Sequence, residues 1–523
     1  MKAYAHAAAI LALASAFAVA IPSSGARAAQ PGAQPAQPAA STVATPDPIR
    51  VLDCLTFGPT ETDLEKLRRE GLTRWLDGQL HPPRTDALPP AAQAQIDSLA
   101  VAQKPMAALV ADIAEKGKAL RDITDPDLKR AAQQAFQQSL NDFARQAATR
   151  DILRDLYAPT QLRERMTWFW FNHFNVHQYK ADIRAMVGDY VDSAIRPHAL
   201  GRFRDLLGAT LHHPAMLRYL DNAQNAVGHL NENYAREIME LHTMGVGSGY
   251  TQADVEELAR ILTGVGIDAS PQNPHLKPEL AGQLVRQGLF EFNPARHDYG
   301  DKVFLGHHIA GRGYAEVEEA LDILAKQPAT ARHISRQIAV YLVSDNPPQA
   351  LIDRMGETFL RTNGDIASVL RTMVTAPEFA AAAAHGKFKD PVRYVLSAVR
   401  LAYGDKVILN TAPIQGWLNR MAEGLYNHET PDGYPLAESS WNGPGQLAVR
   451  FEIARQIGSG SAGLFRPEGP GQTDRPAFPQ FQNALYFSAL KHELKPATVA
   501  VLDQAISPQE WNALFLSSPD FMR

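Results

Sequence analysis

Residues 165–177 read RMTWFWFNHFNVH, and residues 231–243 read NENYAREIMELHT. Both stretches place polar, hydrogen-bonding or titratable groups among large apolar ones at helical spacing. Because a buried polar group needs a partner or a purpose, we expect these two stretches to form core helices and to hold any functional site. The two stretches do not by themselves identify a reaction.

Helical patterns dominate the rest of the chain. The polar, Ala- and Gln-rich residues 127–156 predict one long helix, and Thr160 is the expected N-cap of a helix that runs through Trp168 and His177. Residues 251–254 (TQAD) predict a capping box in which Asp254 replaces the usual Glu. Further helices are expected at residues 63–80, 182–195, 255–262, 317–325, 329–343, 349–362, 365–375, 391–403, 446–457, 498–505 and 508–515.

The helical period disappears between about residues 270 and 313. Residues 288–293 and 302–305 have the composition of short strands, and a turn at Asp298 lies between them, which predicts a small β-hairpin near residues 285–306. The expected fold is mainly α, a single large multi-helix domain with this hairpin as an insert. The spacing of the helical patterns is irregular, and this disfavours a solenoid.

The N-terminus has the pattern of a secretory signal. Lys2 precedes an almost wholly apolar run from Ala7 to Ile21, and the sequence ARA ends at Ala28. We therefore expect a signal peptide at residues 1–28, a Pro/Ala-rich linker at 29–48 and the helical domain at 49–523. The alternative is a membrane anchor, but the apolar run is shorter than the roughly 20 residues of a bilayer span. The expected location is periplasmic or secreted, through general secretion, with no transmembrane anchor once the signal is removed.

Charge and cysteine content narrow the function classes. The formal net charge is −5 and the basic residues are dispersed, which excludes a nucleic-acid footprint. The single cysteine, Cys54, cannot form an intramolecular disulfide, so packing must hold an exported fold together. A small apolar core residue is the expected role of Cys54, and an exported nucleophile is the alternative.

A set of motifs runs in order along the chain, at residues 56–60, 165–176, 231–245, 254–264, 297–302, Gly306, 328–331, 391–393 and the loop at 431–441. Together these motifs resemble the bacterial family known as domain of unknown function 1800. The resemblance implies an exported, mainly helical protein, and it carries no established reaction or catalytic residues. Members are often encoded beside an exported family that looks like sulfatases or phosphatases, which implies a co-exported partner. Residues 429–435 (ETPDGYP) depart from the family's usual Pro-Pro-Asn-Val-x-Gly-Trp.

His173 and His177 are candidate metal ligands. They are four residues apart and would share a helix face, a spacing at which two imidazoles can bind one metal. The zinc-protease pattern needs Glu directly after the first His, where this chain has Phe174. The alternative is that both imidazoles form hydrogen bonds within an aromatic core or at a helix end. A divalent metal is the one cofactor that these residues suggest.

Glu237 and Glu240 are candidate catalytic carboxylates, because three residues along a helix bring them to one face. The alternative is a solvated charge ladder in which Glu232, Arg236 and Glu240 follow at four-residue steps. The neighbouring apolar side chains leave less room for a solvent-facing helix.

His297 and Asp298 are also candidate catalytic residues. They lie with Lys302 in the irregular segment, and an adjacent carboxylate can orient an imidazole and raise its basicity. The alternative is a turn, since Asp and Gly are natural turn formers.

Two functions of different class follow. The first is an exported hydrolase of cell-envelope or extracellular material, in which Glu237 and Glu240 act as acid and base or as metal ligands, with His173, His177 and His297 nearby. The second is a non-catalytic accessory or scaffold protein that docks a co-exported sulfatase- or phosphatase-like partner. The sequence has no nucleophile elbow, phosphate loop, dinucleotide fingerprint or Cys/His zinc knuckle.

Overall fold

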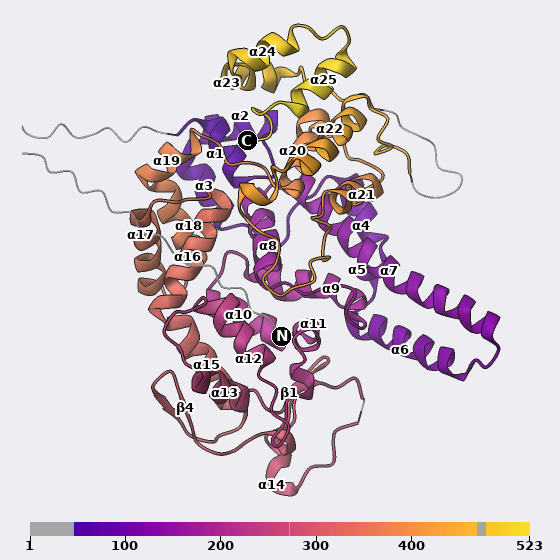
Figure 1. Cartoon of the computed structure of the whole chain (residues 1–523), viewed down its shortest axis with the longest axis vertical. Helices are drawn as coiled ribbons and strands as arrows, with labels where there is room; N and C mark the ends of the chain where they lie inside the picture. The colour runs from indigo at the N-terminus through magenta and orange to yellow at the C-terminus, as the bar shows by residue number, and fades with distance from the viewer. Residues whose placement is uncertain (1–45, 271, 468–476) are drawn as a thin grey trace, which may run out of the picture. The chain divides into compact units, whose positions relative to one another are not determined.

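The structure is a computed structural model, which describes residues 46–270, 272–467 and 477–523. The expected signal peptide at residues 1–28, and the expected linker as far as residue 45, lie outside the described residues. Within them, 25 α-helices and two small antiparallel sheets confirm the mainly α class (Figure 1). No described helix combines the length and the apolarity that a bilayer span requires.

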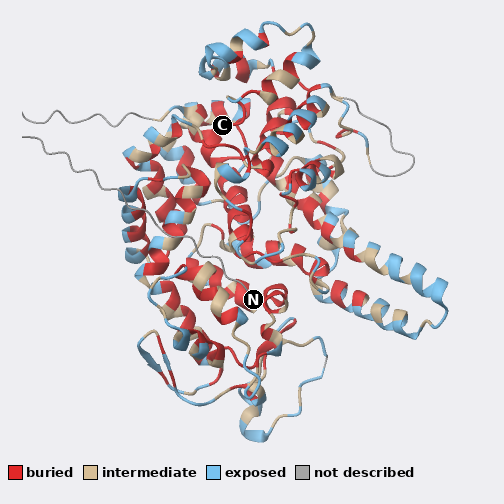
Figure 2. Ribbon diagram, viewed as in Figure 1, coloured by how far each residue is buried: buried red, intermediate tan, exposed pale blue. Residues whose placement is uncertain are grey.

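The first third of the domain is all helical. Its longest helix, α7, begins where the Asp125 side chain accepts hydrogen bonds from the N–H groups of Asp127 and Leu128, and Pro126 occupies the first turn. The expected long helix is therefore confirmed. Figure 1 shows α6 and α7 side by side as a helical hairpin, and Figure 2 shows that its outer end is largely exposed. The helices are α1 Pro48–Leu55, α2 Glu61–Glu70, α3 Leu72–Leu80, α4 Pro90–Asp97, α5 Ala100–Gln103, α6 Met106–Asp122, α7 Pro126–Tyr157 and α8 Gln161–His173.

The middle third alternates short helices with the two sheets. Two of its segments, η2 and η5, are π-helices, and η1, η3, η4 and η6 are single 3₁₀ turns. The capping box at Thr251 and Asp254 is confirmed at the start of α13. The helical segments are η1 Ile183–Ala185, α9 Val187–Asp189, η2 Tyr190–Ile195, η3 Arg196–His198, α10 Phe203–His212, α11 Pro214–Tyr219, η4 Asn222–Gln224, α12 Asn233–Glu237, η5 Ile238–Thr243, α13 Gln252–Ile261, α14 Pro278–Ala281 and η6 Pro294–Arg296.

The β-insert differs from the predicted hairpin. One sheet has the order β1-β3-β2, with strands Val265–Ile267 (β1), Val285–Gln287 (β2) and Phe290–Phe292 (β3). The other pairs Lys302–Phe304 (β4) with His307–Ile309 (β5). The predicted pairing of residues 288–293 with 302–305 is therefore wrong. Each segment pairs with a strand that is nearer in sequence: β3 pairs with β2 across Gly288, and β4 pairs with β5 across a turn at Leu305 and Gly306.

The last third is again helical. In it α16 packs on α17, α17 on α18, and α22 on α25. The segments are α15 Tyr314–Lys326, α16 Pro328–Leu342, α17 Gln349–Arg361, α18 Ile366–Thr375, α19 Pro377–Ala383, α20 Pro391–Tyr403, α21 Ala412–Arg420, η7 Glu438–Ser440 (a 3₁₀ turn), α22 Pro444–Gly458, η8 Tyr486–Leu490 (a π-helix), α23 Lys491–Glu493, α24 Pro496–Leu502 and α25 Pro508–Ser517.

Two helices, α8 and α20, form the centre of the core, since almost every residue of each is buried (Figure 2). The buried Glu164 on α8 is paired: its carboxylate accepts hydrogen bonds from Arg196 Nη2 at 2.6 Å and Nε at 2.9 Å. Thr160 is the N-cap residue of α8 as expected, but its hydroxyl donates to Asp86 instead of capping the helix. The expectation that α8 runs through His177 is wrong, because the helix ends at His173.

Candidate functional site

Glu237 and Glu240 lie where α12 passes into the π-helix η5. The hydroxyl of Thr243 donates to the carbonyl of Ile238 at 2.7 Å, a bond across five residues that fits the wider π turn. The predicted charge ladder is present, with Arg236 at 3.0 Å from Glu232 and 3.5 Å from Glu240. π-Turns inside helices occur frequently at functional sites.

Glu237 differs from its neighbours in the ladder. Its carboxylate is half-buried and has no hydrogen bond or ion pair within the described part of the chain. Burial raises the pKa of Glu237 above its ordinary value, and the negative charges of Glu240 and Asp432 raise it further. A carboxyl group that is held towards its protonated form beside a second, Arg-paired carboxylate is the arrangement of an acid and base pair.

The loop that brings Asp432 to Glu237 is held by two asparagines from the first motif. Asn175 donates from Nδ2 to the carbonyls of His428 at 3.0 Å and Thr430 at 2.8 Å. Asn172 exchanges two hydrogen bonds with the backbone of Tyr434, at 2.9 and 2.6 Å. Residues 165–177 therefore hold this loop through the two asparagines, and Asp432 of the loop raises the pKa of Glu237 in residues 231–243.

A tyrosine and an imidazole complete this neighbourhood, and sequence reasoning missed both. The buried Tyr219 donates its hydroxyl to the carbonyl of Glu429 at 2.7 Å, and burial, Asp432 and Glu237 together raise its pKa. His428 Nε2 lies 3.4 Å from the Asp432 carboxylate. We name Glu237, Glu240, Asp432, Tyr219 and His428 the carboxylate cluster.

His173 and His177 are not on one helix face, so the spacing argument for a shared metal is wrong. His173 Nε2 lies 3.0 Å from the carbonyl of His242, and burial lowers the pKa of His173 to about 3. The imidazoles of His242 and His333 lie 6.0 and 6.1 Å from that of His173. His177 follows the end of α8, and its buried Nδ1 has no hydrogen bond within the described residues.

His297 and Asp298 also have other partners than the sequence suggested. His297 is buried, with Nδ1 2.8 Å from the carbonyl of Thr263 and Nε2 3.0 Å from Glu316. The carboxylate that orients His297 is therefore Glu316, and the expectation that Asp298 does so is wrong. Asp298 pairs with Arg260 at 2.8 Å. The His297–Glu316 pair is closed off from solvent, whereas the Asp298–Arg260 pair is partly exposed, and both lie apart, in sequence and in hydrogen bonds, from the carboxylate cluster.

The described residues contain no group of three or more His, Cys, Asp or Glu side chains placed to hold a metal ion. The imidazoles and carboxylates that the sequence singled out lie in three separate local groups. One is the carboxylate cluster, one is centred on His173, and one is centred on Glu316.

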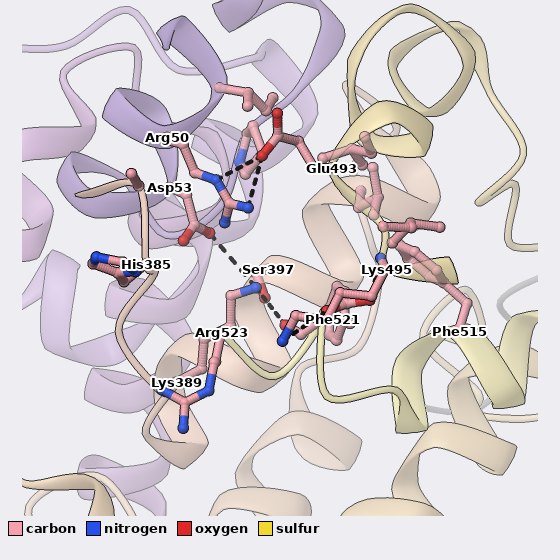
Figure 3. A pocket seen from close by; sticks show the side chains of 17 residues that line it. Arg50, Asp53, His385, Lys389, Ser397, Glu493, Lys495, Phe515, Phe521 and Arg523 are labelled. Atoms are coloured by element: carbon pink, nitrogen blue, oxygen red, sulfur yellow. Dashed lines mark hydrogen bonds and ion pairs between the residues drawn. The ribbon is translucent and has the colours of Figure 1, made fainter. Parts of the chain in front are cut away.

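Several cavities lie away from these groups, among them two that are lined by buried charged residues. The first, of about 220 Å³, is lined by Arg50, Asp53 and Lys389 and by residues close to the C-terminus (Figure 3). The second, of about 20 Å³, is lined by Asp155 and Glu164 and has room for about one water molecule. Burial raises the pKa of Asp155 well above its ordinary value, and the charges of Glu164 and Asp151 add to this effect.

A family model described as protein of unknown function (DUF1800) matches residues 50–523. No curated protein and no solved structure matches the chain at a significant level. The match covers nearly all of the helical domain, and the chain therefore belongs to this family.

Proposed function

We propose that the protein is an exported hydrolase of cell-envelope or extracellular material, with its active centre at the carboxylate cluster. The observation that carries this proposal is the contrast between two neighbouring carboxyl groups. Glu237 has no partner and a raised pKa, whereas Glu240 is paired with Arg236. A carboxyl group with a raised pKa is suited to act as an acid, and a neighbouring carboxylate held by an arginine is suited to act as a base.

In this mechanism Glu237, whose pKa is raised, is the group that donates a proton to the leaving group. Glu240, paired with Arg236, accepts a proton from the attacking water. Tyr219 holds the loop through its bond to Glu429, and the His428–Asp432 pair binds polar groups of the substrate. His297 and Asp298 take no part, because their polar atoms are already engaged with Glu316, Thr263 and Arg260.

The test is release of soluble fragments from isolated cell-envelope material by the purified protein, followed by liquid chromatography and mass spectrometry. Replacing Glu237 with Gln should lower the rate by about 10²–10⁴-fold, the usual contribution of a general acid. The matched control is Glu256→Gln on the exposed face of α13, which should leave the rate unchanged. An equal rate for Glu237→Gln and wild type would reject the proposal.

A second function, docking of a co-exported sulfatase- or phosphatase-like partner, has one observation in its favour. Tyr179, Leu230 and Val246 are exposed apolar side chains at 53%, 44% and 75% of their full surface, and each lies in a segment that flanks the carboxylate cluster. Large exposed apolar groups are typical of interaction surfaces. Capture of the partner by wild type but not by the double variant Tyr179→Ser, Val246→Ser would support docking.

Metal binding at His173 and His177 stays a prediction, and metal analysis of the purified protein tests it.

A further inference from the structure

The cavity of about 220 Å³ has the size and lining of a small-molecule site, and it is independent of the carboxylate cluster. Its walls come from α1, from the segment before α20, from α20 itself and from the residues after Leu490 (Figure 3). An apolar cavity on the order of 150 Å³ is enough to bind benzene. The space is therefore sufficient for a ring or branched chain of that size with a small polar group attached.

One end of the cavity carries both signs of charge. Lys389 is buried, and its Nζ donates to the carbonyl of Phe521 at 2.6 Å and lies 3.5 Å from Asp53. The Asp53 carboxylate is shared with Arg393, whose Nη2 lies 2.6 Å away. Burial lowers the pKa of Lys389 to about 8, and Arg393 contributes to this shift. The Lys389 ammonium is thus only partly compensated, which favours an additional anionic group beside it.

The same end offers carboxylates to a cation. Arg50 and Glu493 form an ion pair of 2.7 Å across the cavity wall, and Glu493 is half-exposed (Figure 3). Lys495 and Asp520 form a looser pair of 3.8 Å. Cations and carboxylates therefore alternate along the polar wall, so that a zwitterion can contact both signs of charge favourably, whereas a ligand with a single charge can do so with only one of them.

The rest of the lining is apolar. Leu401, Phe515 and Phe521 are buried, and Leu490 and Leu494 are half-buried beside them. Such a wall takes up a hydrocarbon side chain and gains about 25 cal/mol for each Å² removed from water.

We propose that this cavity binds a free apolar α-amino acid. The carboxylate of the ligand lies against Lys389 and Arg50, its ammonium group against Asp53 and Glu493, and its side chain against the leucines and Phe515. This ligand satisfies both signs of charge on the polar wall and fills the apolar part of the space.

Isothermal titration calorimetry of the full chain tests the proposal with four probes. L-Leucine and L-phenylalanine should bind, while 3-phenylpropionate and phenethylamine, which each lack one charged group, should bind at least about tenfold more weakly. No heat with either amino acid, or equal binding of the singly charged analogues, would overturn the proposal.

Lys389 and Lys387 lie in the segment before α20, and together they provide a test variant and its matched control. Lys389→Met should weaken L-phenylalanine binding at least about tenfold, whereas Lys387→Met should not. Lys387 is also buried, but it is paired with Asp345 and does not line the cavity. If Lys389→Met fails to fold, Glu493→Gln at the half-exposed rim takes its place, with the same expected loss. Unchanged binding in the folded variant would contradict the assignment.

Discussion

His297 Nε2 lies 3.0 Å from Oε1 of Glu316, and both side chains are fully buried. Lys302 contacts the other oxygen of the same carboxylate, and the N–H groups of Arg312 and Gly313 donate to Oε1. Glu316 on α15 therefore holds the irregular segment that contains β4 and β5. The motif that the sequence presented as a candidate active centre is an anchor for this segment.

Replacing Glu316 with Gln should lower the free energy of unfolding by about 3–5 kcal/mol, because it leaves the Lys302 ammonium buried without a carboxylate. Urea denaturation followed by circular dichroism measures the change. The control is Glu319→Gln on the same helix, which removes only an exposed pair with Arg312 and should cost less than about 1 kcal/mol. Similar losses in the free energy of unfolding for the two variants would show that the buried network stabilises the fold no more than the exposed pair does.

The buried histidines make stability depend on pH. Burial holds the pKa of His242 well below 6.5, and His173 and His333 reinforce this shift. As the pH falls, His242 is therefore protonated near pH 6.5 in the unfolded chain, whereas in the folded protein it stays neutral at that pH. The stability that comes from neutral His242 is complete above pH 6.5 and is lost as pH falls towards the folded pKa. The slope is up to about 1.4 kcal/mol per pH unit for each such histidine.

Urea denaturation at several pH values between 5 and 6.5 tests this dependence, since most carboxylates stay ionised in that window. His242→Gln should make the slope shallower, while His308→Gln, at an exposed site, should leave it unchanged. Equal slopes for wild type and His242→Gln would contradict a neutral buried imidazole.

Cys54 should not react with thiol reagents in the folded protein. Its side chain is buried, and burial raises the pKa of the thiol to about 11, so almost no thiolate is present at pH 8. We expect iodoacetamide to modify Cys54 only in denaturant, as measured by intact mass. Rapid modification of the native protein would instead support the nucleophile that the sequence left open.

The local features were the ones that the sequence predicted well. The capping box at Thr251 and Asp254 and the long helix α7 depend on residues a few positions apart, and both are present. The strand pairing failed because β3 and β4 each had a competing partner closer in sequence. The early end of α8 was missed because nothing at residue 173 is a helix-breaking Gly or Pro.

The site was predictable only in part. The ladder of Glu232, Arg236 and Glu240 follows from helical spacing, and the structure has it. The electrostatic effect of Asp432 on Glu237 joins residues far apart in the chain, and no local pattern encodes such a pair. The cavity of Figure 3 was missed for the same reason, since it joins α1 to the C-terminal residues.

Glu237→Gln should leave the folded protein slightly more stable at pH 7, by up to about 0.5 kcal/mol, because the change removes a half-buried charge that faces Glu240 and Asp432. Thermal unfolding by calorimetry measures the difference. A clear loss of stability would mean that the Glu237 carboxylate has a structural partner, and it would favour the accessory role over the catalytic one.

The most direct test of the acid at the carboxylate cluster is the pKa of Glu237 itself. Difference infrared spectra of wild type against Glu237→Gln, recorded across pH, follow the carbonyl band of its protonated form. We predict a pKa above the ordinary 4.5 that falls when Asp432 is replaced with Asn, because that change removes one of the neighbouring negative charges. A pKa at or below 4.5, unmoved by Asp432→Asn, would contradict the account.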